Sequence, residues 1–250
     1  MNLCEVTGIK TYLIKRLSSK SFYKKSLACR QLGALKLENT QEYILKLSSC
    51  KNNDIKYNAL LALSKLGDLK GIVYMLTNNS KNIHLSHRAV IEIISAFNGI
   101  KEDLFKSTLD LGDDYIKGIL IKAAVDYKIE GLREYYIKYL TNDDKNLRIA
   151  CVRALGNLTI SDNEDYIIKM LEDKEWEVRA ASAKSLEKIG TSNCFIALEK
   201  TIGDNEWWVR HNAACTLISL HGGKEYASKT INGNDKYARD AVVSAIEMLS

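Results

Sequence analysis

Basic side chains recur along the chain about once every 31 residues, and this spacing is the first feature that could carry chemistry. They hold one position of a repeating segment, as Lys25, Lys56, Lys117, Arg148, Arg179, Arg210 and Arg239, with His87 in the remaining copy. A regular row of cations could follow a phosphate backbone. Alternatively, each cation could pair with an acid in a neighbouring turn, such as Asp143, Asp173 or Asp204. Of the two interpretations we favour the structural one.

The tryptophans fall into two classes by position. Trp176 and Trp207 lie one period apart, and Phe22 holds the same column in the first copy, which predicts packing between turn and helix. Trp208 instead takes a position that is polar in the sister copies, and large aromatic side chains are frequent anchors of binding surfaces. His211 and Asn212 follow it within one helical turn. We therefore predict partner contacts at Trp208, His211 and Asn212.

No residue pattern indicates catalysis, a cofactor or a metal. The chain has no Gly-rich phosphate loop, no G-x-S-x-G and no H-E-x-x-H sequence. His84 and His87 could share a metal ion, but no third ligand accompanies them. The six cysteines form no C-x-x-C pair, and Cys29, Cys151 and Cys215 fall in helical segments, which is typical of buried, reduced thiols. The sequence therefore predicts a protein that is not an enzyme.

The elements that position these residues are copies of one unit. The closest pair, E-W-E-V-R-A-A-S-A from Glu175 and E-W-W-V-R-H-N-A-A from Glu206, is separated by 31 residues. With the valine of V-R as an anchor, the copies fall at positions 24, 55, 86, 116, 147, 178, 209 and 238, so that the last interval is 29. Eight and eleven residues after each anchor, all sixteen positions are apolar or aromatic.

Within each unit the spacing of apolar residues is helical. From Val178 they recur at Ala181, Leu186 and Ile189, along one face of a helix with 3.6 residues per turn. Another amphipathic segment lies before each of these helices and is joined to it by a turn. Gly67, Gly190 and Gly222 end helices, at positions where a left-handed residue is expected. The sequence predicts an all-α fold, one solenoid over residues 1–250. Its eight helix–turn–helix repeats have second helices that start near the eight anchors.

Composition and charge restrict the partners. Hydrophobic residues make up 46% of the chain, proline is absent, and no run approaches the length of a membrane span. Residues 1–125 carry 19 Lys and Arg against 11 Asp and Glu, whereas residues 126–250 carry 17 against 20. A basic end can face an acidic partner, a nucleic acid or an anionic lipid surface, or can simply be a solvated helix.

The repeated pattern resembles a known family. The segment D-K-E-W-E-V-R-A-A-S-A-K-S-L from Asp173 is similar to the short bacterial HEAT repeats, which are often labelled after the phycobilisome lyases. The resemblance is close over residues 142–249, moderate over 18–67 and weak over 82–128. It implies the fold, but solenoids of this kind perform many unrelated functions.

We expect a non-catalytic scaffold or adaptor that binds a protein. S-F-Y-K-K-S-L-A-C-R-Q-L-G and D-N-E-W-W-V-R-H-N-A-A also resemble HEAT proteins that accompany membrane glycosyltransferases of bacteria. That resemblance implies a membrane-associated partner and a cytoplasmic location at the inner face of the membrane. The alternative is a DNA-binding protein similar to the helical-repeat DNA glycosylases. Attachment of a bilin chromophore is implied by the family label alone.

Overall fold

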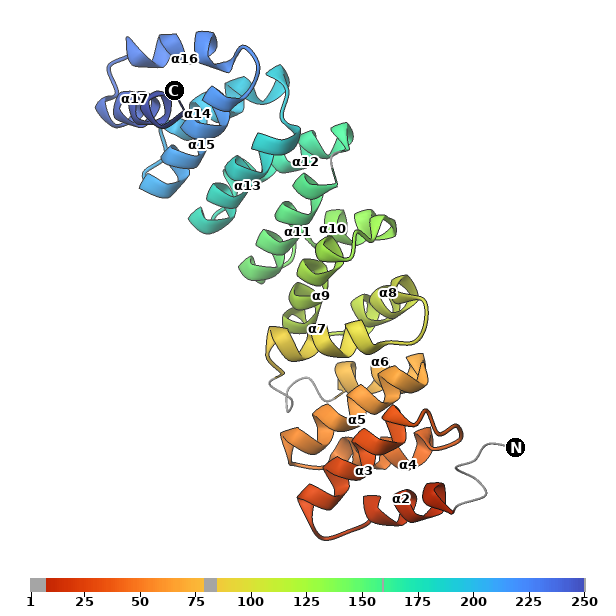
Figure 1. The fold of residues 1–250 in the computed structure, drawn as a ribbon. Helices are drawn as coiled ribbons and strands as arrows, with labels where there is room; N and C mark the ends of the chain where they lie inside the picture. The colour runs from red at the N-terminus through yellow and green to blue at the C-terminus, as the bar shows by residue number, and fades with distance from the viewer. Residues whose placement is uncertain (1–7, 79–84, 159, 250) are drawn as a thin grey trace. The chain divides into compact units, whose positions relative to one another are not determined.

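The computed structural model describes residues 8–78, 85–158 and 160–249, and every regular element in these ranges is a helix (Figure 1). The chain divides into two compact units, residues 1–123 and 124–250, and each is described by itself. A long α-helix, α9, crosses the boundary in the chain between them. The all-α fold expected from the sequence is confirmed.

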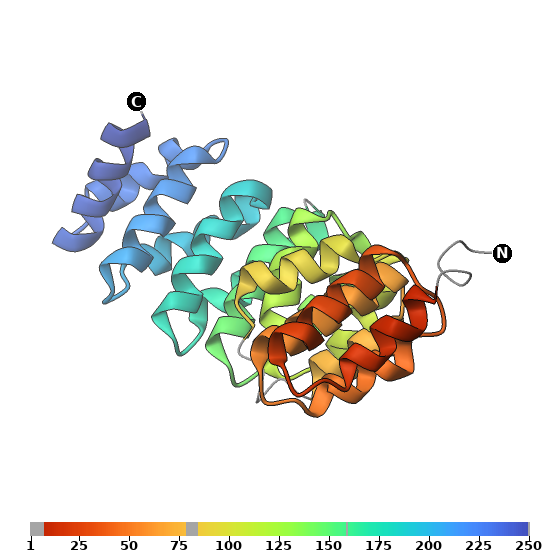
Figure 2. The ribbon, with the colours of Figure 1, turned by 60° about the horizontal axis from the view of Figure 1, so that its bottom comes forward.

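Unit 1 contains the first four helical pairs. In chain order its elements are α2 (Ile9–Leu17), α3 (Phe22–Ala34), α4 (Gln41–Leu45), the 3-10 helix η1 (Lys46–Ser49), α5 (Asn53–Leu66), α6 (Leu69–Asn78), α7 (His87–Ala96), α8 (Lys101–Leu111) and α9 (Asp114–Asp126). The second helices α3, α5 and α7 pack in series, and α2 and α4 cover α3 and α5. Figure 2 shows α2, α3 and α5 side by side from a second direction.

Unit 2 repeats this arrangement in two layers. Its elements are η3 (Glu130–Leu132), α10 (Arg133–Tyr139), α11 (Lys145–Asn157), η4 (Ser161–Asn163), α12 (Glu164–Lys169), η5 (Met170–Glu172), α13 (Trp176–Ile189), η6 (Ser192–Cys194), α14 (Phe195–Ile202), α15 (Trp207–Ser219), α16 (Gly223–Ile231) and α17 (Lys236–Leu249). The second helices α11, α13, α15 and α17 pack side by side, and each contacts the first helix of its own pair.

The helix starts follow the repeat found in the sequence. Second helices begin two residues before the anchor in every pair except the third, where Ser86 is itself the cap of α7. Short polar side chains accept hydrogen bonds from the first free N–H groups, as Asn52 does for Ile55 and Asp144 for Leu147. Because each turn carries its own stop and start signal, the 31-residue period becomes a period of helical pairs.

The core lies between the two helix layers. The column eight residues after the anchor is completely buried in the first seven repeats, as Leu32, Leu63, Ile94, Ala124, Leu155, Leu186 and Leu217. The column eleven residues after the anchor is only partly covered, and its terminal members Leu35 and Leu249 are exposed. The difference follows from position, because the later column stands on the last helical turn, at the edge of the layer.

Two of the three glycines expected to be left-handed are so. Gly67 ends α5 at a φ of 70°, and Gly222 precedes α16 at 78°. For Gly190 the expectation was wrong, because this residue ends α13 in an extended conformation, with φ −66° and ψ 143°. A Cβ at this position would lie 2.6 Å from the Leu186 carbonyl oxygen. Glycine is therefore required at residue 190 for space and not for backbone angle.

The closest helix contact in unit 1 predicts a strong response to one methyl group. A Cβ at Gly33 on α3 would lie 2.6 Å from the Ala62 Cα on α5, which is backbone and cannot rotate away. We expect Gly33→Ala to lower the free energy of unfolding by about 2 kcal/mol, as overpacked cores do. The matched control is Gly118→Ala on α9, where nothing lies within 4 Å and a gain of about 0.5–1 kcal/mol is expected. Urea unfolding of both variants is the measurement, and equal effects would contradict this account.

Candidate functional site

The basic row becomes a set of buried ion pairs in unit 2. Arg148 on α11 donates from Nε and Nη2 to the two carboxylate oxygens of Asp173, both at 2.8 Å, and its Nη1 donates to the carbonyl oxygens of Asn142 and Asp143. The side chains of Arg148 and Asp173 are only 4% and 8% exposed. One guanidinium therefore fastens the turn before its own helix to the turn before the next.

The next pair has the same geometry. Arg179 donates to both oxygens of Asp204 at 2.7 and 2.9 Å, and its Nη1 reaches the carbonyl oxygen of Asp173. Burial alone would raise the pKa of Asp204. Hydrogen bonds from Arg179 and from the Glu206 N–H, together with the charge of Arg179, outweigh burial and lower that pKa. The hydrogen bonds to Asp204 likewise raise the pKa of Arg179.

The row of paired arginines ends after two members. Arg210 still donates to the carbonyl oxygens of Asp204 and Asn205, but its guanidinium lies over the ring of Tyr237, 5.3 Å from the centroid. Asp235 caps α17 through the N–H groups of Tyr237 and Ala238. The shortened interval explains this change, because it places Gly233 where the earlier repeats have Asp173 and Asp204. Arg239 accordingly donates to the Gly233 carbonyl oxygen.

In unit 1 the row is less regular. Lys25 is half-buried, Lys56 is only 4% exposed, and the ammonium of Lys117 lies 3.9 Å from the Asp114 carboxylate. His87 is exposed at the start of α7. The other half of the possible histidine pair, His84, lies outside the described residues.

The second-helix face of unit 2 carries a groove of about 330 Å³. Its floor is the small-residue face of α13, and its walls come from α11 and α15. The lining residues are Ile149, Arg153, Trp176, Glu177, Ala180, Ala181, Lys184, Ser185, Trp208 and Asn212. Small side chains in the middle helix and large ones on both sides produce the depression.

Of the three predicted contact residues, the structure places two in this groove. Trp208 is 56% exposed and lines its α15 wall, and Asn212 lies beside it while its amide donates a 3.0 Å hydrogen bond to the Ala180 carbonyl oxygen on α13. His211 is not among the lining residues, because its ring stacks on Trp207 at 4.8 Å with an interplanar angle of 10°. Trp207 is itself 54% exposed, so the expectation that it packs between turn and helix was wrong.

The groove continues into a basic hollow. A second depression of about 260 Å³ shares Arg153, Lys184 and Ser185 with the groove and adds Gly156, Asn157, Glu187 and Lys188. Lys184 pairs with Glu187, and Lys188 donates to the Asn157 side-chain oxygen. Arg153 is exposed and forms no ion pair with an acid in the described part of the chain. The combined surface is therefore aromatic at one end and cationic at the other.

Glu177 gives the aromatic end an unsatisfied acceptor. Its Oε1 accepts from the Lys145 ammonium, and this hydrogen bond, with the backbone N–H and the nearby charges, lowers the pKa of Glu177. Its Oε2 is buried, yet within the described residues it has no hydrogen-bond partner. A buried carboxylate oxygen without a donor is unfavourable, and the ion pair with Lys145 offsets part of this cost.

Sequence reasoning found only part of this surface. It assigned the periodic Trp176 to packing and did not single out the other members, Ile149, Arg153, Lys184 and Lys188. A signal was present. Each of these residues lies two positions before its anchor, or two, six or ten positions after it. These positions form the helix face that the buried columns leave free.

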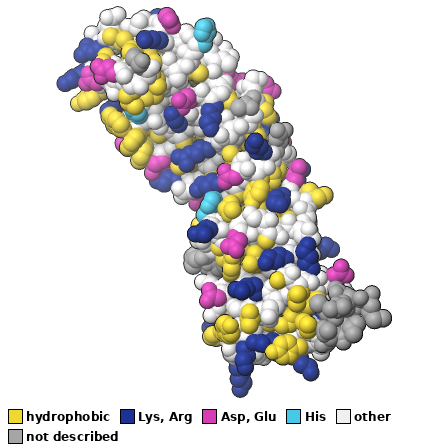
Figure 3. Space-filling model, viewed as in Figure 1, with side chains coloured by type: hydrophobic (Ala, Val, Ile, Leu, Met, Phe, Trp, Pro, Cys, Tyr) yellow, Lys and Arg dark blue, Asp and Glu magenta, His cyan; other side chains and the backbone are white. Residues whose placement is uncertain are grey.

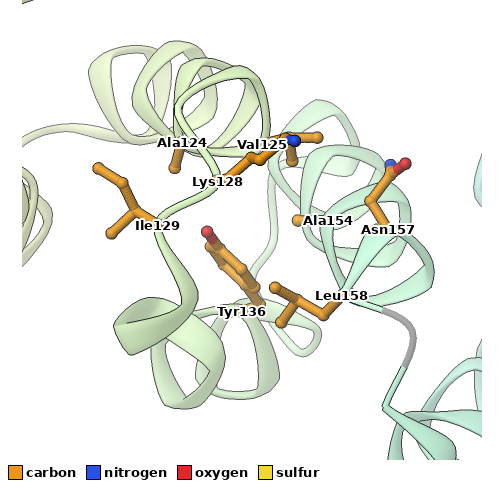
Figure 4. A pocket seen from close by; sticks show the side chains of 8 residues that line it. All are labelled: Ala124, Val125, Lys128, Ile129, Tyr136, Ala154, Asn157 and Leu158. Atoms are coloured by element: carbon orange, nitrogen blue, oxygen red, sulfur yellow. The ribbon is translucent and has the colours of Figure 1, made fainter.

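Another hollow of unit 2, of about 290 Å³, lies between the end of α9, α10 and α11. Figure 4 shows the Tyr136 ring entering it from α10, with its hydroxyl directed into the space. Burial raises the pKa of Tyr136, so the hydroxyl stays protonated at neutral pH. Of the eight lining residues only Lys128 and Tyr136 are titratable, and the hollow contains no carboxylate or imidazole that could accept the Tyr136 proton.

The thiols are poorly suited to nucleophilic chemistry. Cys29 and Cys151 are completely buried, and burial raises the pKa of the Cys29 thiol to about 12. The thiol is therefore fully protonated near neutral pH, whereas a nucleophilic cysteine needs the thiolate. Among the described residues, no three His, Cys, Asp or Glu side chains gather as a metal site would require.

The comparison with protein families identifies the class. Residues 133–220, which span α10 to α15, match the family model of HEAT repeats. Residues 133–220 are thus HEAT repeats, and the helical pairs have the α-solenoid architecture that the sequence pattern indicated. The matched stretch contains both ion pairs and the groove. No curated protein sequence matches the chain.

Solved structures extend the comparison over nearly the whole chain. The complex of CpcE and CpcF of phycocyanin lyase from Nostoc sp. PCC7120 is 15% identical over 96% of this chain and 94% of that one, with a TM-score of 0.38. The Escherichia coli protein YibA is 15% identical over 100% and 98%, with a TM-score of 0.39. An engineered protein is 19% identical over 98% and 69%, with a TM-score of 0.35. These likenesses are too distant to transfer a partner or an activity.

The Arg179–Asp204 pair predicts a specific pH dependence. Because folding lowers the pKa of Asp204, the pair stabilises the fold above the unfolded pKa, about 3.9, and its contribution is lost as the pH falls through the folded pKa. At pH 7 we expect Asp204→Asn to lower the free energy of unfolding by about 3 kcal/mol. The difference from the wild type should shrink towards zero below about pH 4.

The control is Asp235→Asn, because Asp235 caps a helix without an arginine partner in the described structure. Little change in the free energy of unfolding is expected for it, because Asn caps a helix about as well as Asp does. Urea unfolding between pH 7 and pH 3 measures both differences. A difference for Asp204→Asn that does not change with pH would show that the ion pair is not its cause.

Proposed function

We propose that this chain is a non-catalytic interaction scaffold that holds an extended segment of a partner protein in the groove of unit 2. The observation that carries the proposal is the exposed Trp208 beside a floor of small residues. A half-exposed tryptophan at the wall of a depression supplies a large apolar surface for an incoming side chain. Stacked helical repeats characteristically bind through such extended surfaces.

The size of the groove supports a peptide and not a folded surface. Together the groove and the basic hollow run along α13 from Trp176 to Lys188. A helix of that length rises about 18 Å, which an extended peptide covers with roughly five or six residues.

The charges specify the partner further. At the far end of the groove, Arg153, Lys184 and Lys188 are all exposed. We infer a segment with a large apolar residue that lies against Trp208 and acidic residues that lie near these cations. The narrower hypothesis from the sequence, a membrane glycosyltransferase as the partner, is compatible with such a segment but requires a direct test.

The nucleic-acid alternative loses its main support in unit 2. Arg148 and Arg179 direct their guanidinium groups to buried carboxylates, so these cations are not available to a phosphate backbone. We therefore keep the protein-binding function as the single proposal.

Selection from a displayed library of random twelve-residue peptides tests it. We expect the enriched peptides to share a large apolar residue followed or preceded by Asp and Glu. Trp208→Ala should weaken binding of an enriched peptide at least tenfold, because the anchor loses most of its apolar contact, by about 1.4 kcal/mol or more. The exposed Ile196 on α14 provides the control, and Ile196→Ala should leave binding unchanged.

The readout is intrinsic fluorescence. All three tryptophans of the chain, Trp176, Trp207 and Trp208, lie at this groove or next to it, so a bound peptide should shift their emission. Enrichment of basic peptides, or equal losses for Trp208→Ala and Ile196→Ala, would refute the proposed function.

A further inference from the structure

Two aromatic side chains stand exposed at the start of α3 in unit 1. Phe22 is 60% exposed and its neighbour Tyr23 is 73% exposed. Ser21 caps the helix by accepting a hydrogen bond from the Lys24 N–H, so the first turn that carries both rings is fixed and not frayed. Two adjacent aromatic rings exposed to water indicate a surface that a membrane or another molecule covers.

The surroundings of these rings are uniformly cationic. Residues 8–36 contain no Asp or Glu and eight basic residues, namely Lys10, Lys15, Arg16, Lys20, Lys24, Lys25, Arg30 and Lys36. Five of them, Lys15, Lys20, Lys24, Arg30 and Lys36, are exposed. No ion pair joins any of the eight to an acid within the described residues. Figure 3 shows Lys and Arg side chains gathered around hydrophobic ones at this end of unit 1.

We propose that this basic-aromatic patch, formed by Lys15, Lys20, Phe22, Tyr23 and Lys24, docks on the surface of an anionic lipid bilayer. Tyr23 has an apolar ring with a polar hydroxyl and would lie at the boundary between headgroups and acyl chains. Phe22 would insert beside it as a purely apolar side chain. The flanking lysines would lie among anionic headgroups, which attract them electrostatically close to the surface. The proposal is independent of the peptide groove in unit 2.

Composition favours a lipid surface over a nucleic acid. The patch contains three lysines, whereas the nearby Arg16 donates to the Tyr12 hydroxyl and lies over that ring. A lysine is a point charge on a long apolar stem, suited to headgroups above a hydrocarbon boundary. Readout of bases relies on bidentate arginine and amide groups, which the patch lacks. In the described residues no helix is long and apolar enough to cross a bilayer, so the contact proposed here is peripheral.

Co-sedimentation with vesicles tests the patch. The full chain should sediment with phosphatidylcholine vesicles that contain about 30 mol % phosphatidylserine and not with phosphatidylcholine alone. The double variant Lys20→Glu, Lys24→Glu should bind the anionic vesicles at least about tenfold more weakly. Phe22→Ser with Tyr23→Ser should also weaken binding, but should leave its salt dependence unchanged, because no charge is altered.

Lys224→Glu with Lys236→Glu makes the same change in net charge at exposed positions of unit 2 and should bind like the wild type. Thermal unfolding of each variant ensures that a loss of binding is not a loss of fold. Equal weakening by the two lysine pairs would reduce the effect to net charge and overturn the proposal. The absence of vesicle binding would also overturn the proposal, even if a duplex DNA fragment bound through the same lysines.

Discussion

One guanidinium bound to two successive turns is the interaction on which the groove of unit 2 depends. Arg148 and Arg179 each donate hydrogen bonds to carbonyl oxygens in the turn before their own helix. Each also donates to both carboxylate oxygens of an aspartate in the turn before the next second helix. Each carboxylate also accepts a hydrogen bond from the backbone N–H two residues later in the chain. The Glu175 N–H donates to Asp173, and the Glu206 N–H donates to Asp204. Each ion pair therefore fixes how one helical pair sits on the next, and thereby holds α11, α13 and α15 in register.

That register determines what the exposed face presents. A helical pair cannot bury its own apolar stripe, so neighbouring pairs must cover it, and the fully buried column from Leu32 to Leu217 shows how completely they do. The opposite side of each second helix is then left without a cover. In unit 2 that side has small residues on α13 and tryptophans or cations on both sides of them, which is sufficient to form a groove.

Much of this follows from the sequence because the period is strong. The anchors located the second helices to within two residues, since each unit repeats its apolar phase. Trp208 was found because it departs from the repeat, and Asn212 because it follows Trp208 within one helical turn. Arg153 and Lys184 were not found, because an outward cation looks the same in sequence whether it faces solvent or borders a depression.

Other details depended on three-dimensional packing. A Cβ at Gly190 would meet the Leu186 carbonyl oxygen and the Cys194 sulfur, and no sequence rule for helix ends contains that crowding. The change at Arg210 is different, because the shortened last interval was visible in the sequence. Only the structure showed its consequence, which is that Asp235 becomes a helix cap and the guanidinium of Arg210 lies over the ring of Tyr237.

The account centres on the claim that the second-helix face of unit 2 is where a partner segment binds. Photo-cross-linking tests this most directly, with a peptide enriched on the chain carrying a benzophenone group and the modified residues located by mass spectrometry. The account predicts labels on α11, α13 and α15, at residues such as Ile149, Ala181 and Lys184 that line the groove. Labels confined to the first helices, at Ile196 of α14 or Lys169 of α12, would contradict it.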